Sequence, residues 1–275
     1  MSFYTSLSGL KAAQTDLGAI SNNLANVGSS GFKRSRAQFG DLFASSPTQS
    51  TKMTAGQGVR LNGVVQQFTQ GTLEASDKTL DLGIAGEGFF VVRGAPPRGE
   101  VTYTRNGAFS PNSSGQVVDT IGSKLQLLPV DATGTTSSTA LADAFDFVLP
   151  AGSPSDPTVP LANVSIGIDG LVTATYADGS SEMLGKVAMA SFPAVEGLRP
   201  IGDAHWQSTG DSGPATLNTA TSGPLGSIRS GALERANVDV TEELVALISA
   251  QRNFQANAKA IETAKNMTQA VININ

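Results

Sequence analysis

Both ends of the chain carry the hydrophobic spacing of amphipathic helices. In the first 27 residues, apolar positions recur three or four apart at Leu10, Ala13, Leu17, Ile20, Leu24 and Val27. A slightly broader stripe near the C-terminus contains Val240, Leu244, Leu247, Phe254, Ala258, Ile261, Ala264, Met267, Val271 and Ile274. Such spacing places each set on one helix face. Because terminal segments fray unless they pack against something, the pattern predicts that the helices pair, within the chain or between copies.

Between these ends the hydrophobic period shortens to the two-residue alternation of β-strands. Val59, Leu61 and Val65 alternate with polar residues, and Leu80, Leu82 and Ile84 repeat the pattern. Turn signals of the Asn-Gly and Asp-Gly type follow at residues 106–107, 169–170 and 178–179. The predicted fold class is therefore α+β: a mainly β central region, with paired N- and C-terminal amphipathic helices forming a coiled-coil inner domain.

Composition narrows the class of partner. A chain of 275 residues that is 40% hydrophobic has room for one large domain or two smaller ones and is not wholly disordered. Its net charge of −5 argues against nucleic acid or an anionic membrane as the main partner, which leaves protein. The absence of cysteine excludes disulfides and thiolate metal sites. No apolar run approaches the ~18 residues of a membrane span, so no membrane insertion is predicted.

Candidate catalytic chemistry is weak. His205 is the sole histidine, and one histidine does not build a histidine-rich metal site, so a packing or surface role is predicted. Acid pairs such as Asp81 with Glu87 could serve a glycosidase, but acids in turns more often support turn geometry. Neither a G-x-S-x-G elbow nor a Walker A loop is present. The chain is predicted to be no enzyme and to hold no cofactor or metal, with a secreted glycan-active β-protein as a minor alternative.

Several separated motifs resemble one protein family. The sequences LSGL at 7–10, ISNNLAN at 20–26 and GFK at 31–33 are similar to the N-terminal signature of bacterial flagellar rod and hook proteins. Later motifs of that family are matched by GEGFF at 86–90, YTRNG at 103–107, GALERANV at 231–238, ELV at 243–245 and QRNF at 251–254. The order is correct, and the resemblance covers nearly the whole chain except residues 129–160. Within the family, DLF at 41–43 followed closely by GQGV at 56–59 is most like the hook protein.

The resemblance implies a structural subunit that polymerises into the tubular hook, a flexible joint that transmits torque between rod and filament. It also implies a place in the flagellar basal body and hook, outside the cell, reached through the flagellar type III export apparatus without a cleaved signal peptide. The implied partners are further copies in a helical homopolymer, together with rod, hook-cap and hook–filament junction proteins. The alternative within the family is the distal rod protein, a rigid drive shaft, since hook proteins commonly carry an outer domain that residues 129–160 are too few to form.

The predicted domain organisation is nested. It consists of a coiled-coil polymerisation domain at 1–30 with 236–275, an extended connector at 31–70, a β-rich domain at 71–128 with 161–235, and a low-complexity loop at 129–160 in place of an outer domain. Isolated helices are marginal, so the terminal helices are expected to become ordered when neighbouring subunits cover their apolar stripes.

The predicted assembly interface follows the two stripes and the asparagines near the end of the first helix. It comprises Leu10, Leu17, Ile20, Asn22, Asn23, Leu24, Asn26, Val27, Leu244, Leu247, Phe254, Ile261 and Val271. Asparagine is a mediocre helix former, so three within five residues predict amides that bond across helices or end the helix.

A basic cluster follows the first helix and contains Lys33, Arg34 and Arg36. It is either a solvated connector or one half of inter-subunit ion pairs, for which Glu242, Glu243 and Glu262 are candidate acids. Exposed ion pairs are worth roughly 0.2–1 kcal/mol each, which suits contacts that slide reversibly in a bending tube.

Overall fold

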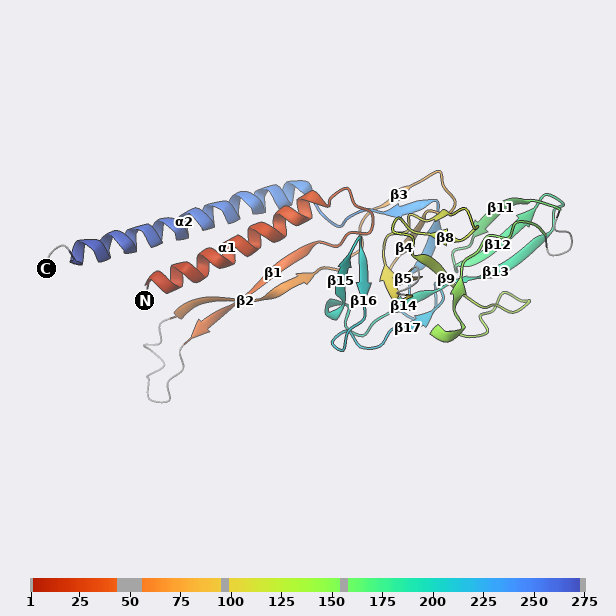
Figure 1. The fold of residues 1–275 in the computed structure, drawn as a ribbon, viewed down its shortest axis with the longest axis horizontal. Coiled ribbons are helices and arrows are strands. Elements are labelled where there is room, and N and C mark those ends of the chain that lie inside the picture. Colours follow the sequence, from red (N-terminus) through yellow and green to blue (C-terminus); the bar gives the residue numbers. More distant parts are fainter. Residues whose placement is uncertain (1, 44–55, 95–98, 154–157, 273–275) are drawn as a thin grey trace. The chain divides into compact units, whose positions relative to one another are not determined.

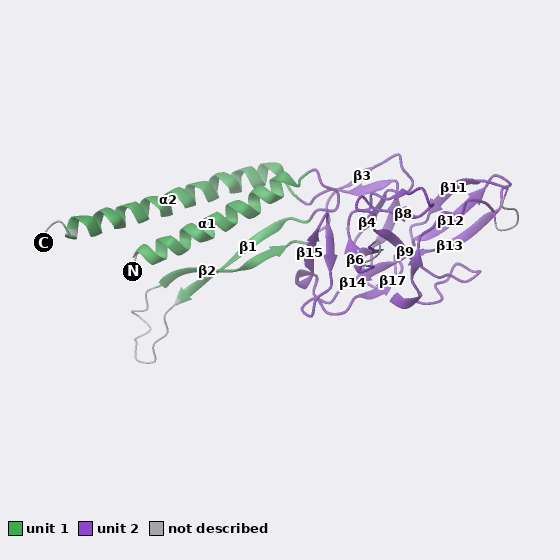
Figure 2. Ribbon diagram, viewed as in Figure 1, with its two compact units in different colours: residues 1–27, 33–67, 238–275 green, residues 28–32, 68–237 purple. Residues whose placement is uncertain are grey.

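The computed structural model describes residues 2–43, 56–94, 99–153 and 158–272 (Figure 1). The chain divides into two compact units, each built from segments that are far apart in the sequence (Figure 2). Unit 1 contains residues 1–27, 33–67 and 238–275, and unit 2 contains residues 28–32 and 68–237.

Unit 1 consists of two long helices and a two-stranded ribbon. Helix α1 (Ser2–Ala25) packs against α2 (Val240–Ile272), and the strands β1 (Ser35–Phe43) and β2 (Gly56–Gln66) pair antiparallel beside α1. The red and blue helices lie side by side in Figure 1. The Asp239 carboxylate caps α2 by accepting hydrogen bonds from the backbone N–H groups of Thr241 (2.7 Å) and Glu242 (3.1 Å), which satisfies donors that the helix leaves free.

The connector predicted at 31–70 is thus largely a β-ribbon that belongs to the helical unit. Its register pairs Ser35 with Gln66 and Asp41 with Val59, and irregularities fall after Gln38 and Asp41. Such bulges bend and twist a strand, which adapts the ribbon to a helix beside it.

Unit 2 is built on a 13-stranded sheet whose main order is β11-β12-β13-β9-β5-β6-β16-β15. Two small sheets pair β18 with β4 and β19 with β3. The bounds are β3 Leu73–Ala75, β4 Leu82–Ala85, β5 Phe89–Arg93, β6 Val101–Thr104, β7 Ser110–Pro111, β8 Val117–Val118, β9 Lys124–Leu128, β10 Phe145–Asp146, β11 Leu161–Ile166, β12 Leu171–Tyr176, β13 Ser181–Val187, β14 Met189–Ser191, β15 Arg199–Gly202, β16 His205–Gln207, β17 Thr216–Asn218, β18 Ser227–Ser230 and β19 Ala232–Glu234, with short 3₁₀ helices η2 Leu141–Asp143 and η3 Val195–Gly197.

Strand β5 shows why this unit has a core on both faces of its sheet. Its run Phe89-Phe90-Val91-Val92 is buried throughout, and alternate side chains enter two different apolar clusters. Phe90 and Val92 join one cluster, whereas Phe89 and Val91 join the other. A continuous apolar run is the sequence pattern of a strand covered on both faces. Strand β5 therefore contributes side chains to both clusters.

Residues 129–160, predicted as a low-complexity loop, contribute to this core. Strand β10 pairs with β9, and Phe147 is fully buried in the first cluster. Residues 154–157 lie outside the described part of the chain. The few apolar residues of this segment therefore pack it onto the core, although the segment is otherwise polar. The average composition of the segment does not reveal this packing.

Candidate assembly site in the helical unit

The terminal helices pair within one chain, the first of the two arrangements that the sequence left open. On α1, Ala13 and Ile20 are buried, and Leu10, Leu17 and Leu24 are half-buried. On α2, Ala250 is buried, while Leu247, Phe254 and Ile261 are half-buried. The fold thus covers the α1 stripe and the middle of the α2 stripe, whereas Val240, Leu244 and Met267 of the α2 stripe are exposed. The side chain of Val271 lies outside the described residues.

The helices approach each other closely where α1 carries a glycine. A Cβ atom at Gly9 would lie 2.8 Å from the Oδ1 atom of Asn257 on α2. The Asn257 amide also donates a hydrogen bond to the carbonyl of Asn253, one turn earlier. A small residue here permits a polar side chain to sit in the seam, which favours one helix register over slipped ones.

A second apolar line on α2 is uncovered in the single chain. Val240, Leu244 and Ile248 are spaced four residues apart and are exposed, and Val245 beside them is 61% exposed. Residues at this spacing share one helix face. Leu244, predicted as an interface residue, therefore lies on a face that α1 leaves open.

A polar cluster, which we call the latch, joins α1, α2 and the ribbon. Its centre is Asn23, only 1% exposed, whose amide Nδ2 donates to the Ser35 carbonyl (2.9 Å) and whose Oδ1 accepts from the Ser35 N–H (2.8 Å). The same Nδ2 donates to Oε2 of Glu243 on α2 (3.2 Å). One asparagine therefore satisfies both backbone groups at the start of β1 and reaches the second helix.

Arg34 completes the latch with two acids from the first turn of α2. Its Nε lies 2.6 Å from Oε1 of the buried Glu243, in an ion pair that is close but not aligned as a linear hydrogen bond. Its Nη2 donates to Oε1 of the exposed Glu242 at 3.0 Å. Acids in the first turn also interact favourably with the positive end of the helix dipole.

These contacts change the interpretation of the predicted charges. Arg34, Glu242 and Glu243 were predicted to form ion pairs between subunits, and the structure shows that they pair with one another within one chain, because the ribbon returns beside the start of α2. Arg36 is exposed and lies near Asp16, where burial raises the pKa of the Asp16 carboxyl and the Arg36 charge partly opposes that rise. Lys33 is fully buried. Pairing between subunits stays a prediction for all of these residues.

The other two asparagines lie at the end of α1. The Asn26 amide donates to the Asn22 carbonyl at 2.9 Å, and its backbone N–H points to the carbonyls of Asn22 and Asn23. Asn22 is exposed, and Val27 is half-buried. Both predicted roles occur: Asn23 bonds across helices, and Asn26 ends a helix.

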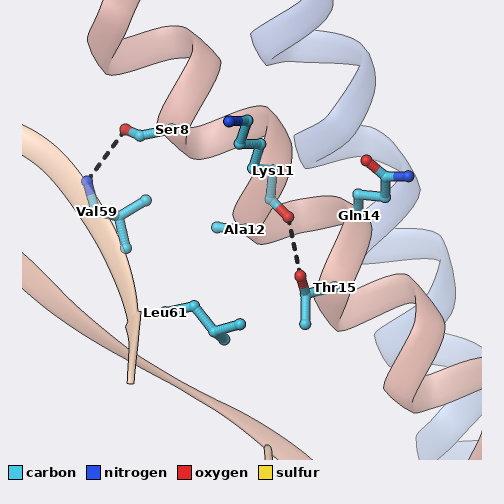
Figure 3. Close-up of a pocket in the computed structure, with 7 residues that line it drawn as sticks. All are labelled: Ser8, Lys11, Ala12, Gln14, Thr15, Val59 and Leu61. Atoms are coloured by element: carbon cyan, nitrogen blue, oxygen red, sulfur yellow. Dashed lines mark hydrogen bonds between the residues drawn. The ribbon is translucent and has the colours of Figure 1, made fainter. Parts of the chain in front are cut away.

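A groove of about 400 Å³ separates α1 from the ribbon (Figure 3). In Figure 3, Val59 and Leu61 of β2 face Ala12 and Thr15 of α1. The groove is closed at one end by a hydrogen bond from the Val59 N–H to the Ser8 hydroxyl at 3.2 Å. Its full lining is Ser8, Lys11, Ala12, Gln14, Thr15, Val59 and Leu61. The groove thus places apolar β2 side chains opposite a helix face of mixed polarity.

In unit 2, His205 has a structural environment. It is fully buried on β16, its Nε2 lies 2.8 Å from Oδ2 of the buried Asp119, and its Nδ1 lies 2.8 Å from the Asp203 carbonyl. Asp119 also accepts hydrogen bonds from the backbone N–H groups of Ile121 and Ser123. The packing role predicted for the histidine is thus a buried polar one, which the sequence did not specify.

Within the described part of the chain, neither helix is long and apolar enough to cross a membrane.

The chain matches three flagellar family descriptions along its length. Residues 3–33 match "Flagella basal body rod protein", residues 83–174 match "Flagellar hook protein FlgE/F/G D1 domain", and residues 229–274 match "Flagellar basal body rod FlgEFG protein C-terminal". The first and last matches cover α1 and α2, and the middle one lies in unit 2.

Curated relatives match from end to end. The flagellar basal-body rod protein FlgG of Caulobacter vibrioides is 34% identical over 281 positions, covering 97% of this chain and 96% of the relative. FlgG of Buchnera aphidicola subsp. Schizaphis graminum is 32% identical over 280 positions, covering 98% and 97%. The flagellar hook protein FlgE of Escherichia coli is 27% identical over 412 positions, covering all of both chains.

Proposed function

This chain belongs to the flagellar rod and hook protein family, and we propose that it is a rod-type subunit with the role of the distal rod protein. It is a non-enzymatic structural subunit of the flagellar axis. The motifs at 41–43 and 56–59 favoured the hook in the sequence analysis, but the whole-chain comparisons support the rod alternative better.

The choice of rod over hook rests on the lengths of the alignments with the two kinds of relative. Alignment with the rod relatives needs 280 or 281 positions for the 275 residues of this chain. Alignment with the hook relative needs 412 positions, half as long again, and the excess has no counterpart here. In unit 2, residues 129–160 add a short strand and a buried phenylalanine to the existing core. They do not supply the outer domain that hook proteins commonly carry, and a rod subunit does not need one.

Self-assembly would use the surfaces that the single chain leaves uncovered. The exposed line Val240, Leu244 and Ile248 belongs to α2, and the groove lies between α1 and β2, so the two surfaces share no residue. We propose that the occupant of each is another copy of the chain. Two unlike surfaces that meet in succession give an open helical polymer rather than a closed dimer. Fully burying a leucine or isoleucine contributes roughly 1.5–3 kcal/mol, so a few such contacts suffice.

The latch gives the rod interpretation a mechanical reason. It holds the ribbon to both helices through buried polar contacts, whose loss would leave unpaired groups inside the protein. A ribbon held in this way would resist sliding against the helices, which suits a stiff shaft. Further partners of the proposed subunit are adjacent rod and hook proteins at its ends and the flagellar type III export apparatus.

Deleting the gene and imaging the remaining basal bodies by electron microscopy tests the proposal. A distal rod subunit predicts shortened rods without hooks, and the restored gene should return full rods. Full-length rods that lack only the hook would overturn the rod assignment in favour of the hook. Tubes grown from purified chain add a second criterion, because rod subunits should form straight tubes and hook subunits curved ones.

A further inference from the structure

His205 and Asp119 form a buried pair in unit 2 that the assembly function does not use. Both side chains are 0% exposed, and Nε2 of the imidazole lies 2.8 Å from Oδ2 of Asp119. The other ring nitrogen, Nδ1, lies 2.8 Å from the Asp203 carbonyl oxygen. Turning the ring over would put a carbon in place of each nitrogen and lose both contacts. The contacts therefore fix the orientation of the ring.

These two contacts determine how many protons the pair holds. A carbonyl oxygen only accepts hydrogen bonds, so Nδ1 must carry a proton and donate it to Asp203. An ionised carboxylate is also only an acceptor, and a bare Nε2 would present a lone pair to it. A contact at hydrogen-bond distance therefore requires a second proton between Nε2 and Oδ2. The folded pair thus holds one proton more than a neutral histidine beside an ionised aspartate.

Hydrogen bonds to the second carboxylate oxygen favour the histidine as the owner of that proton. Oδ1 of Asp119 accepts from the backbone N–H groups of Ile121 at 3.0 Å and Ser123 at 2.8 Å. Hydrogen bonds of this kind stabilise the ionised form of a carboxylate. The pair is therefore an imidazolium beside a carboxylate, with a proton on each ring nitrogen.

The other charged side chains on β6, β15, β16 and the turn after Asp119, or next to these elements, have other surroundings. They are Arg105, which pairs with Glu234 at 3.2 Å, Lys124, which pairs with Asp146 at 2.8 Å, Arg199, which bonds to the side chain of Gln207, and the exposed Glu100 and Asp203. Among the described residues, Asp119 is thus the one charged side chain that a hydrogen bond or ion pair joins to His205.

The pair also holds a turn whose backbone is strained. Asp203 and Ala204 connect β15 to β16 with φ angles of +51° and +56°, a left-handed conformation that is unfavourable for residues other than glycine. The Asp203 carbonyl accepts from His205, and the Ala204 carbonyl accepts from the Thr104 hydroxyl at 2.8 Å. Strand β15 ends the main order of its sheet, beside β16. Loss of the proton would therefore loosen this edge hairpin first.

We propose that the His205–Asp119 pair keeps its proton at pH values where an unfolded histidine has lost its own, which makes the stability of unit 2 sensitive to alkaline pH. In unfolded chains, histidine is half-protonated near about pH 6.5 and aspartate near about pH 3.9. Between about pH 4.5 and 6 both states hold the same number of protons, so this pair adds no pH dependence. Above about pH 7 the folded state holds one more. The unfolding equilibrium constant should then rise by up to about tenfold per pH unit.

The composition of the chain makes the proton visible. His205 is the sole histidine, Trp206 beside it is the sole tryptophan, and cysteine is absent, so histidine is the only side chain that ordinarily titrates between about pH 6 and 8. NMR of the full-length chain with ¹⁵N-labelled histidine should show protons on both ring nitrogens at pH 8. A ring with a proton on Nδ1 alone at that pH would overturn the proposal.

The variant Asp119→Asn removes the charge and keeps the geometry. The amide oxygen can accept from Ile121 and Ser123 as before, and the amide NH₂ group can donate to a bare Nε2. Nδ1 alone should then carry a proton at pH 8. Urea unfolding followed by Trp206 fluorescence between pH 7 and 9 should show a pH dependence weaker than that of the unsubstituted chain by up to about tenfold per pH unit.

Asp131→Asn is the matched control. Oδ1 of Asp131 accepts from the backbone N–H groups of Thr133 and Thr135 in a similar turn, with no histidine as its partner, so the pH dependence should equal that of the unsubstituted chain. Equal pH dependence in all three chains would overturn the proposal. If Asp119→Asn fails to fold, the ring nitrogens of the unsubstituted chain still decide it. Neither measurement depends on whether the subunit is of the rod or the hook type.

Discussion

The two units of this protein are stabilised by different means. Unit 2 buries large side chains such as Phe89, Phe90 and Phe147 completely. Among the described residues of unit 1, the buried apolar residues are Ala13, Ala19, Ile20, Ala37 and Ala250, four of them alanines. Unit 1 has little apolar core and relies on helix pairing and the polar latch. Several of its larger apolar side chains, among them Val245 and Ile248, remain exposed, as a subunit that assembles through this unit requires.

The largest expected effect is in the core of unit 2. Phe147→Ala should lower the free energy of unfolding by about 3–5 kcal/mol, since it opens a cavity in a fully packed cluster. Phe145→Ala, two residues away at an exposed position, is the matched control and should cost less than about 1 kcal/mol. Denaturant unfolding followed by Trp206 fluorescence measures both. Equal, small effects would show that residues 129–160 are not part of the core.

A smaller effect is expected in the latch. Glu243→Ala leaves Arg34 and Asn23 without their buried partner and should cost about 2–4 kcal/mol locally, at the low end because Arg34 is partly exposed. Glu242→Ala removes the exposed acid from the same arginine and should cost under about 1 kcal/mol. Hydrogen exchange at the Gln67 amide, which donates to the Arg34 carbonyl, reports the difference. If the two variants behave alike, the latch is not the point that holds the ribbon.

Gly58 tests the contact between α1 and the ribbon. Its φ is +109°, and a Cβ atom there would lie 2.3 Å from the Ser8 hydroxyl. Gly58→Ala should therefore cost about 1–2 kcal/mol in backbone strain and weaken the hydrogen bond from the Val59 N–H to Ser8. Gly63→Ala on the same strand is the control, because no described atom lies within 4 Å of its Cβ position. Exchange of the Val59 amide should rise in the first variant alone.

Substitutions on the exposed face of α2 should have the smallest effect on the stability of the folded chain but a large effect on polymerisation. Val245→Ser and Ile248→Ser replace exposed apolar residues of α2, so the unfolding free energy should change by less than about 0.5 kcal/mol. Polymerisation, followed by light scattering, should nevertheless slow markedly, because the contact with the next copy loses buried apolar area. Normal tube growth would show that this face is not an assembly surface.

Most of the fold follows from hydrophobic period. The stripes at 2–27 and 240–271 predicted α1 and α2, and two-residue alternation predicted the β-rich middle of the chain. The pairing of the ribbon and the burial of Phe147 were not predicted. Hydrophobic periodicity shows which face of an element is apolar, but it does not show which other segment covers that face. The 31–70 segment was called extended, but only the structure shows that its two halves pair.

The polar site was less predictable. Three asparagines near the end of α1 indicated a special role, yet the sequence could not show that Asn23 is the one buried against Ser35 and Glu243. Arg34 and Glu243 are far apart in the chain, and charge patterning alone could not tell a partner in the same chain from one in a neighbour. The proposal of a rod rather than a hook subunit rests on whole-chain length and identity and not on any motif.

The central claim is that the terminal helices already pair in the monomer near the latch, before any other copy covers them. Hydrogen exchange on a chain verified as monomeric tests it directly. Amides of α1 from 13 to 24 and of α2 from 243 to 254 should be protected, whereas those from 263 to 270, whose side chains are mostly exposed, should exchange rapidly and slow only in the polymer. Rapid exchange along both helices of the monomer would contradict the claim and restore the hypothesis that they order only on assembly.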